Sequence, residues 1–406
     1  MLTENTSKRA GGQSPVRGFA AQTGPVFFLT STFLLNFISR IILSPLLPTV
    51  ERELAISHKQ AGLLFFLISA GYLTGLLSSG FLSSRTTHRR TILVSSAGVG
   101  VALLFVSLAT DLRVMQGGLL VLGLASGFYM PSAIATITAL FDRRHWGKAI
   151  AIHELAPNLA FFLSPFVAES FLRWGSWRAA LGFLGVASLA ACAAYRRWGR
   201  GGEFAGESPA SGAFGELIRL PTFWLMILLF GLGVSATVGI YAMLPLYLVT
   251  ERHMESTWAN TIVAFSRAYG PFLGMLGGWA SDRLGAKQTI VISMMFTGVM
   301  TLMLGLVADP WISAVVLLQP LLAVWFFPAA FAAVAMFAPA RSRNLAVGFT
   351  VPFGFLIGGG ATPTFIGIMG DVKLFALGFT ITGLLITAAG ALALLLKLPT
   401  STQGGH

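Results

Sequence analysis

Residues 80–95 read GFLSSRTTHRRTILVS, and residues 278–293 read GWASDRLGAKQTIVIS. The glycine, arginine and threonine positions of these two stretches coincide at a constant offset of 198 residues: Gly80 with Gly278, Arg85 with Arg283, and Thr91 with Thr289. Solenoid repeats recur every 20 to 50 residues, so an offset near half the chain length indicates two similar halves instead. The motif Leu46-Leu47-Pro48 likewise returns as Met243-Leu244-Pro245. The sequence therefore predicts an internal duplication.

The composition around these stretches is that of a membrane protein. Of the 406 residues, 55% are apolar and only 10% are charged, whereas soluble domains carry about 25% charged residues. This excludes a soluble enzyme, a disordered chain and a disulfide scaffold, the last because Cys192 is the only cysteine. The net charge of +12 does not indicate nucleic acid binding, since no polar domain exists to gather the basic residues on one face. The lipid bilayer is the expected surrounding.

Apolar segments of about 20 residues, the length that crosses a bilayer, recur along the whole chain. Twelve spans are predicted, six in each half, near residues 25–49, 61–82, 91–110, 114–140, 148–172, 177–197, 222–250, 258–281, 288–308, 311–338, 344–370 and 372–396. The predicted organisation is an N-terminal tail (1–24), a first six-helix bundle (25–197), a Gly/Ser/Pro-rich linker (198–220), a second six-helix bundle (221–397) and a C-terminal tail (398–406). The first tail lacks the apolar core and cleavage site of a signal peptide. The fold class is an all-α polytopic membrane protein with two pseudo-symmetric bundles.

The loop charges predict the orientation. With the N-terminus inside, cytoplasmic segments hold 18 of the 27 basic residues against 6 acidic ones, while the opposite side holds 7 of each. Cytoplasmic loops of membrane proteins carry such an excess of Lys and Arg. We therefore expect a multi-pass protein of the bacterial inner membrane, with both termini cytoplasmic, acting as a monomer.

The two repeated stretches resemble the signature loop of the major facilitator superfamily, Gly-x-Leu-x-Asp-Arg-x-Gly-x-Lys/Arg. The later copy keeps most of it, in Gly278, Asp282, Arg283, Gly285 and Lys287; the earlier copy keeps Gly80, Leu82, Arg85 and Arg89 but has Ser84 in place of the Asp. The resemblance implies the superfamily fold of twelve helices and a gating role for these loops. In the superfamily the Asp latches the loop to a neighbouring helix in one access state, and with Ser84 in its place this latch is not expected in the first half.

Two arginines fall within predicted spans, where an ionisable residue costs roughly 2.5–3.5 kcal/mol and usually faces a cavity or a partner. Arg267 lies near mid-membrane in span eight, and Arg40 lies nearer the outer end of span one. A guanidinium presents a fixed fork of donors that matches a carboxylate or phosphate. Arg267 resembles the carboxylate ligand of the monocarboxylate and oxalate branch, and Arg40 that of the organic phosphate and anion symporters. Both are predicted to bind an organic anion between the halves.

Neutral polar residues extend this predicted site. In the superfamily, helices one, four, seven and ten line the cavity, and the candidates on those helices are Asn36, Tyr129, Tyr241 and Gln319. Their hydroxyl and amide groups can orient a bound anion. A single polar residue of this kind within a span is, however, more often a residue that packs one helix against another. His153 and Glu154, near the cytoplasmic start of span five, have side chains that can titrate and so couple transport to protons. Interfacial snorkelling beside Lys148 explains them equally well.

The chain lacks the sequence motifs of several ATP-dependent, metal-dependent and hydrolytic proteins. It contains no Gly-x-x-x-x-Gly-Lys-Ser/Thr phosphate loop, no Cys/His cluster with metal-site spacing and no Gly-x-Ser-x-Gly elbow, so no cofactor or metal and no enzymatic activity are predicted. The favoured function is secondary active transport of a small carboxylate-type anion by rocker-switch alternating access, in symport with H+. The alternative is efflux of amphipathic or drug-like compounds by the same fold. A sensor or assembly protein would be expected to have longer soluble segments.

Overall fold

The computed structural model describes residues 19–206, 214–339 and 342–398. Every regular element in those ranges is a helix, and eleven helical stretches are long and apolar enough to cross a membrane. Most of both predicted tails, the middle of the linker and Arg341 of a basic loop lie outside the described residues. The chain is an all-helical multi-pass membrane protein, as its composition predicts.

The N-terminal half crosses the bundle six times. Several crossings consist of two helices in line, interrupted at Ile42, Phe128 and Glu154. In chain order the crossings are α1 (Phe19–Ile41) with α2 (Leu43–Leu54); α3 (His58–Arg85); α4 (His88–Ser107); α5 (Leu112–Gly127) with α6 (Tyr129–Leu140); η1 (Arg143–His145) and α7 (Trp146–His153) with α8 (Leu155–Leu172); and α9 (Trp177–Trp198).

The C-terminal half repeats this arrangement after the short linker helix α10 (Phe214–Leu217). Two of its crossings contain a π-helical segment, η2 and η4, a distortion that is frequent at functional sites. The crossings are α11 (Pro221–Val234), η2 (Ser235–Gly239) and α12 (Ile240–Thr250); α13 (Ser256–Phe265) and α14 (Gly270–Leu284); α15 (Ala286–Leu306); α16 (Asp309–Leu318), η3 (Ala323–Trp325) and α17 (Phe326–Phe337); α18 (Arg343–Phe355), η4 (Leu356–Ala361) and α19 (Thr362–Asp371); and α20 (Phe375–Leu392) with η5 (Ala393–Leu395).

The eighth crossing is not the continuous span that the sequence predicts. Its two helices, α13 and α14, are separated by a turn at residues 266–269 that contains Arg267. Pro271 explains the break, because its ring nitrogen has no hydrogen to donate to the carbonyl of Arg267 one turn earlier. The backbone N–H of Gly270 donates to that carbonyl instead, at 3.0 Å. With this interrupted crossing included, the twelve predicted crossings are present.

The first crossing extends farther than predicted. It runs from Thr23 to Leu54, whereas the apolar pattern placed its end at residue 49. The helix continues because Glu51, Arg52 and Glu53 occupy its last turns, where charged side chains reach water. Arg40 lies near the middle of this helical stretch. Its predicted place nearer the outer end of the apolar layer stays a prediction.

Polar residues at the loops begin several of these helices. The Ser57 hydroxyl accepts the backbone N–H of Gln60, and the Gln60 side chain accepts the N–H of Ser57, at 3.3 and 2.9 Å. The Asp111 carboxylate caps α5 by accepting the backbone N–H groups of Arg113 and Val114. The Glu255 carboxylate accepts the N–H groups of Thr257 and Trp258 at the start of α13, and these hydrogen bonds lower the pKa of Glu255.

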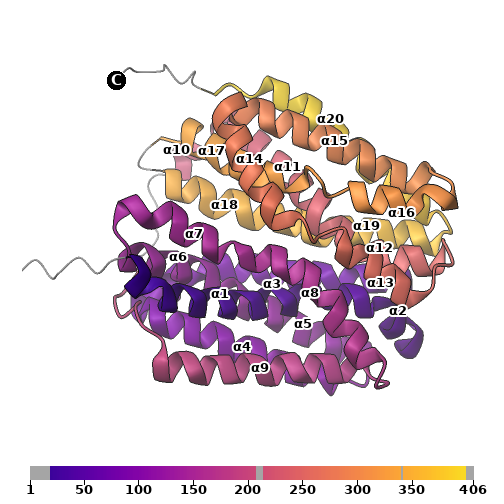
Figure 1. Ribbon diagram of the computed structural model, residues 1–406, viewed down its shortest axis with the longest axis horizontal. Helices are drawn as coiled ribbons and strands as arrows, with labels where there is room; N and C mark the ends of the chain where they lie inside the picture. Colours follow the sequence, from indigo (N-terminus) through magenta and orange to yellow (C-terminus); the bar gives the residue numbers. More distant parts are fainter. Residues whose placement is uncertain (1–18, 207–213, 340–341, 399–406) are drawn as a thin grey trace, which may run out of the picture.

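The two halves lie side by side (Figure 1), the N-terminal half in indigo to magenta and the C-terminal half in orange to yellow. The first and last described residues lie at the same end of the bundle, which we call the terminal end. The opposite end, with the loops at residues 55–57, 251–255 and 372–374, is called the distal end.

Glycines bring the halves into backbone contact toward the distal end. A Cβ atom on Gly62 of α3 would lie 2.4 Å from the Pro363 carbonyl oxygen, and one on Gly367 of α19 would lie 2.2 Å from the His58 carbonyl oxygen. Only glycine permits so close an approach. Hydrogen bonds between the halves reinforce this side: Ser44 Oγ donates to the Tyr241 carbonyl at 2.6 Å, and Asn260 Nδ2 donates to the Pro45 carbonyl at 3.1 Å.

Candidate functional site

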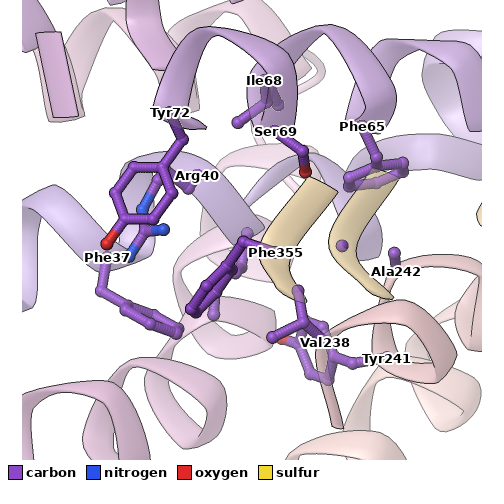
Figure 2. Close-up of a pocket in the computed structure, with 12 residues that line it drawn as sticks. Phe37, Arg40, Phe65, Ile68, Ser69, Tyr72, Val238, Tyr241, Ala242 and Phe355 are labelled. Carbon is purple, nitrogen blue, oxygen red and sulfur yellow. The ribbon is translucent and has the colours of Figure 1, made fainter. Parts of the chain in front are cut away.

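A small cavity lies between the two halves (Figure 2). From the N-terminal half, helices α1 and α3 line it; from the C-terminal half, η2, α12, α18 and η4 do so. The lining is mainly aromatic and aliphatic, with a few polar groups: Phe37, Arg40, Ile41, Phe65, Ile68, Ser69, Tyr72, Val238, Tyr241, Ala242, Phe355 and Gly359. Such a composition, apolar walls with few polar groups, is typical of small-molecule sites.

Arg40 is the charged residue of this cavity. Its side chain is 6% exposed, and its guanidinium carbon lies 4.1, 4.6 and 5.6 Å from the ring centres of Tyr72, Phe37 and Phe355. These aromatic contacts stabilise the cation. Arg40 Nε is buried and has no hydrogen-bond partner within the described part of the chain. The guanidinium therefore retains donor capacity for a ligand in the cavity.

Arg267 is equally buried, at 5% exposure, but does not line the cavity. One terminal nitrogen donates to the Thr237 carbonyl of η2 at 3.3 Å, and Nε has no partner among the described residues. Its guanidinium carbon lies 5.1 Å from the Phe161 ring centre and 5.5 Å from that of Tyr241. Because Tyr241 also lines the cavity, its ring connects Arg267 to the site.

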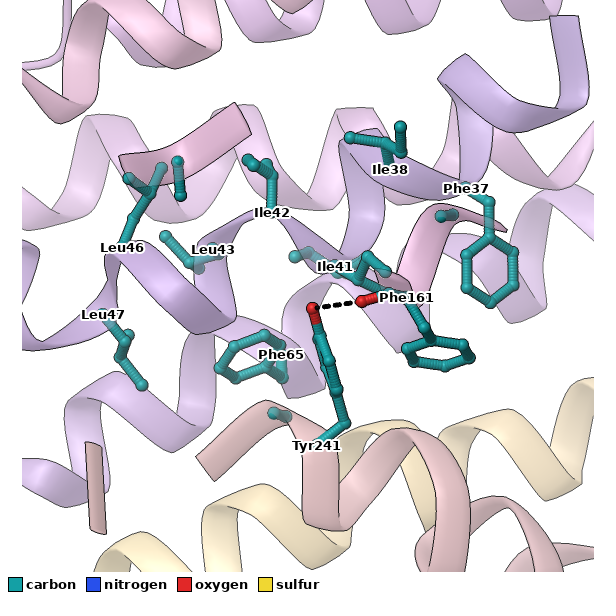
Figure 3. Close-up of a cluster of buried hydrophobic side chains, with 14 of the residues drawn as sticks. Phe37, Ile38, Ile41, Ile42, Leu43, Leu46, Leu47, Phe65, Phe161 and Tyr241 are labelled. Carbon is teal, nitrogen blue, oxygen red and sulfur yellow. Dashed lines mark hydrogen bonds between the residues drawn. The ribbon is translucent and has the colours of Figure 1, made fainter. Parts of the chain in front are cut away.

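An aromatic bridge joins the two arginines across the halves. Tyr241 of α12 donates its hydroxyl hydrogen to the Phe161 carbonyl of α8 at 3.4 Å (Figure 3). The Phe161 ring packs edge-on against Tyr241 at 4.8 Å and against Phe37 at 5.3 Å. Since Phe37 contacts Arg40 and Tyr241 contacts Arg267, a movement of either half would disturb both guanidinium environments.

Neither buried arginine is neutralised by a carboxylate. The ion pairs of the described residues involve other side chains, and none of them includes Arg40 or Arg267. Burying a charge without a partner costs several kcal/mol. Two uncompensated cations beside one cavity between the halves favour a negatively charged occupant.

His153 and Glu154 form a second group with Tyr129, inside the N-terminal half. His153 is fully buried; Nδ1 lies 3.1 Å from Glu154 Oε1 and Nε2 lies 3.3 Å from the Tyr129 hydroxyl. Phe33 stacks on the His153 ring at 4.5 Å and on Tyr129 at 5.4 Å. Glu154 lies at the break between α7 and α8 and its side chain is 42% exposed. The half-exposed Glu154 carboxylate therefore contacts a fully buried imidazole.

The structure places Asn36 and Gln319 away from the cavity. The Asn36 amide donates to the Ser126 carbonyl at 3.3 Å, within the N-terminal half. The Gln319 amide donates to the Ala236 carbonyl of η2 at 2.8 Å and to Thr301 Oγ1 at 3.0 Å. Gln319 thus satisfies a carbonyl that the π-helical segment leaves without its usual partner.

We expect Gln319→Leu to lower the stability of the protein by about 1–3 kcal/mol, because the buried Ala236 carbonyl would lose its donor. Thermal unfolding in detergent measures this change. The matched control is Gln116→Leu, at a half-buried glutamine of α5 for which the structure describes no side-chain hydrogen bond. Equal losses of stability in the two variants would contradict the structural role of Gln319.

The gating-loop residues lie at the terminal end. Arg89 donates to the carbonyls of Gly199 and Arg196 and to the Glu203 carboxylate, at 2.8, 3.0 and 2.8 Å, and so fixes the start of the linker to α4. Arg85 is exposed at the end of α3. In the later copy Asp282 and Arg283 are exposed, and Gly285, with φ of +86°, ends α14. Gly80, Gly278 and Lys287 belong to the same two terminal-end segments.

Tyr72 and Phe355 are site residues that sequence reasoning missed. Tyr72 stands in the second span, which the helix-number argument did not treat as lining, and Phe355 is one of many phenylalanines. The glycine run at residues 358–360 was a usable signal. It marks η4, where Gly360 approaches α3 so closely that a Cβ would lie 3.0 Å from the Ser69 side chain.

Comparison with known proteins bears on both fold and function. A family profile described as Major Facilitator Superfamily matches residues 29–275, more than half of the chain. The chain is similar to a protein named "probable sulfoacetate transporter" from Cupriavidus necator, with 24% identity over 39% of this chain and 36% of that protein. It is also similar to the class G tetracycline resistance protein of Vibrio anguillarum, with 27% identity over 68% of this chain and 73% of that protein.

Solved structures agree on the fold. A bacterial homologue of the human lysosomal transporter Spinster, in an inward-facing and unoccupied conformation, superposes with a TM-score of 0.78 at 16% identity, over 92% of this chain and 96% of that one. A transporter of the POT family in complex with a thioalcohol-conjugated peptide gives a TM-score of 0.74 at 11% identity, over 92% and 95% of the two chains.

Proposed function

Because the chain belongs to the major facilitator superfamily, we propose that it is a secondary transporter that moves a small carboxylate-type organic anion by alternating access. Membership makes it a membrane transporter and not an enzyme. The identity of the cargo and its coupling to protons are our proposal.

One observation supports an anion as the transported compound. Arg40 lines a cavity between the halves and is buried with no carboxylate of the described residues beside it. Arg267 lies behind Tyr241 and is also buried without a carboxylate partner among the described residues. A carboxylate bound at the free edge of Arg40 would form charge-assisted hydrogen bonds and offset the cost of the buried charge. The relative named for sulfoacetate, an anionic compound, is consistent with such a cargo.

The transport cycle follows from the interface between the halves. In this structure the glycine contacts and the hydrogen bonds of Ser44 and Asn260 hold the halves together on the distal side of the cavity. The loop charges predict that this end faces the outside of the cell. We therefore assign the structure to the inward-facing state, from which rocking about the cavity would open the distal end.

Proton coupling is assigned to Glu154 with His153. The Glu154 carboxylate is accessible and contacts the buried imidazole. We expect Glu154→Gln to abolish accumulation driven by a pH gradient, because the amide cannot titrate, while exchange of labelled for unlabelled substrate continues. Asp142→Asn, at an exposed carboxylate of the neighbouring loop, is the matched control and should accumulate normally. Gradient-driven accumulation by Glu154→Gln would remove this residue from the coupling mechanism.

The proposed function is tested with the purified protein in proteoliposomes. Uptake of labelled mono- and dicarboxylates and of a sulfonate is measured with and without an imposed pH gradient. We expect saturable uptake of at least one anion, increased by an acidic exterior. The absence of saturable uptake of every anion would refute the proposal.

Efflux of amphipathic compounds is the second candidate. Its support is the tetracycline resistance relative, which matches over more of the chain than the sulfoacetate relative does, together with the aromatic lining of the cavity. The buried arginines disfavour cationic compounds. Adding tetracycline to the same vesicles separates the two candidates, since transport of tetracycline without transport of any carboxylate would favour efflux.

A further inference from the structure

The distal contact between α3 and α19 contains a titratable group that the proposed coupling mechanism does not use. We propose that His58 is a second proton-binding residue, which holds the distal end closed when its imidazole is protonated and releases it when the imidazole is neutral. The proposal rests on alternating access but does not depend on which compound is carried.

His58 lies at the seam between the halves. It is the first residue of α3, in the N-terminal half, and its ring centre lies 5.2 Å from that of Phe375 in the C-terminal half. A Cβ on Gly370 of α19 would lie 3.0 Å from the His58 ring, so the ring is held directly against that helix. His153 differs in this respect, because the partners described for it, Phe33, Tyr129 and Glu154, all belong to the N-terminal half.

One carboxylate contacts the ring, and two carboxylates of the opposite half interact with it electrostatically. Glu51 of α2 is the nearest, with Oε1 2.5 Å from His58 Nδ1. Asp371 ends α19 and accepts the backbone N–H of Lys59 at 3.3 Å; Glu251 accepts the N–H of Ala376 at 3.1 Å. Both Asp371 and Glu251 also interact electrostatically with His58. The ammonium group of Lys59 is the adjacent positive charge on α3.

The charges around His58 determine whether its protonation opens or closes the distal end. An imidazolium at His58 attracts Glu51 on its own half and both Asp371 and Glu251 on the opposite half, so it favours the closed seam. A neutral imidazole removes the one cation that attracts carboxylates of both halves, and the carboxylates then repel one another across the interface. Lys59, Arg252 and Lys373, the other cations near these carboxylates, keep their charge over the whole pH range and so do not cause a pH response. Histidine changes its charge between about pH 5 and 8. Acid therefore favours closure of the distal end, and alkali favours its opening.

The experiment measures the distal distance by double electron–electron resonance. Spin labels are attached to cysteines at Arg113 and Trp311, exposed residues of opposite halves near the distal end. The background carries Cys192→Ser, which removes the chain's single cysteine. Without added substrate, we expect the ratio of long to short distances to rise about tenfold between pH 5.5 and 8.5, a size typical of coupling between two sites.

Two variants separate charge from packing. His58→Gln should show long distances throughout the pH range, and His58→Lys, a permanent cation, should keep short distances even at pH 8.5. His253→Gln, at an exposed histidine of the distal loop, is the control and should respond to pH as the parent protein does. A parent protein without a pH response, a His58→Gln variant that still responds, or a His58→Lys variant that opens would each overturn the proposal. A normal response in a protein that transports no organic anion would refute only the proposed cargo.

Discussion

Replacing Arg40 with glutamine is expected to lower anion uptake by about 10- to 100-fold at subsaturating substrate. A hydrogen bond to a charged group contributes about 1.5–3 kcal/mol, and each 1.4 kcal/mol corresponds to a factor of ten. Arg40→Lys should lose nearly as much, because an ammonium keeps the charge but cannot present two parallel donors from within the cage of Phe37, Tyr72 and Phe355. Initial rates in proteoliposomes over a range of substrate concentrations measure the effect.

Two other arginines serve as comparisons for Arg40. Arg113→Gln, at an exposed arginine of the distal end, should leave uptake unchanged. Arg267→Gln should be less damaging to affinity than Arg40→Gln, since Arg267 reaches the cavity only through the Tyr241 ring. If Arg40→Gln transported normally while Arg267→Gln lost its affinity for the anion, Arg267 would be the ligand, as its resemblance to the monocarboxylate branch implies.

The crossings could be predicted from sequence because a helix in a bilayer needs a continuous apolar segment. Such segments can be identified without knowing the tertiary structure. The end of the first helix shows where that rule stops applying. Residues 51–53 are charged, so the apolar run ends before them, yet the helix continues into water as far as Leu54. Hydropathy marks the limit of the apolar layer and not the end of a helix, so the helix is longer than the predicted span while the predicted depth of Arg40 in the apolar layer is unaffected.

The break at Arg267 had a signal in the sequence that was not used. Gly270 and Pro271 follow directly, and a proline within a helix removes the hydrogen bond to the residue four positions earlier, here Arg267. The direction of the Arg267 side chain had no such signal. It depends on where η2 places the Thr237 carbonyl and the Tyr241 ring, residues about 30 positions away in the chain.

The polar candidates show what helix number alone cannot predict. Asn36 and Arg40 are one turn apart on α1, yet the Asn36 amide turns toward Ser126 inside its own half while Arg40 enters the cavity. Gln319 lies on the tenth crossing but is used to satisfy the Ala236 carbonyl of η2. A helix that lines a cavity also has faces that pack on neighbouring helices. Whether a given polar residue faces the cavity or a neighbour depends on local distortions such as η2, which hydropathy does not detect.

Replacing Gly367 with valine is expected to prevent the distal end from closing and to reduce transport at least tenfold. A Cβ at this position would lie 2.2 Å from the carbonyl oxygen of His58 and 2.8 Å from its carbon, which are backbone atoms that cannot rotate away. Overpacking of this kind costs about 1–3 kcal/mol. The cost arises only when α3 and α19 are in contact, so it shifts the equilibrium toward the open distal end by about 5- to 150-fold.

The same distal spin labels at Arg113 and Trp311 measure this shift, and Gly348→Val is the matched control. Gly348 lies on α18 of the same crossing, and a Cβ there would meet nothing within 4 Å. The control should retain both the short distal distance and transport, because its extra methyl groups occupy open space. A Gly367→Val protein with unchanged distal distances would mean that α3 and α19 can separate without opening the cavity. A variant with long distal distances but full transport would mean that closing this seam is not a step of the cycle.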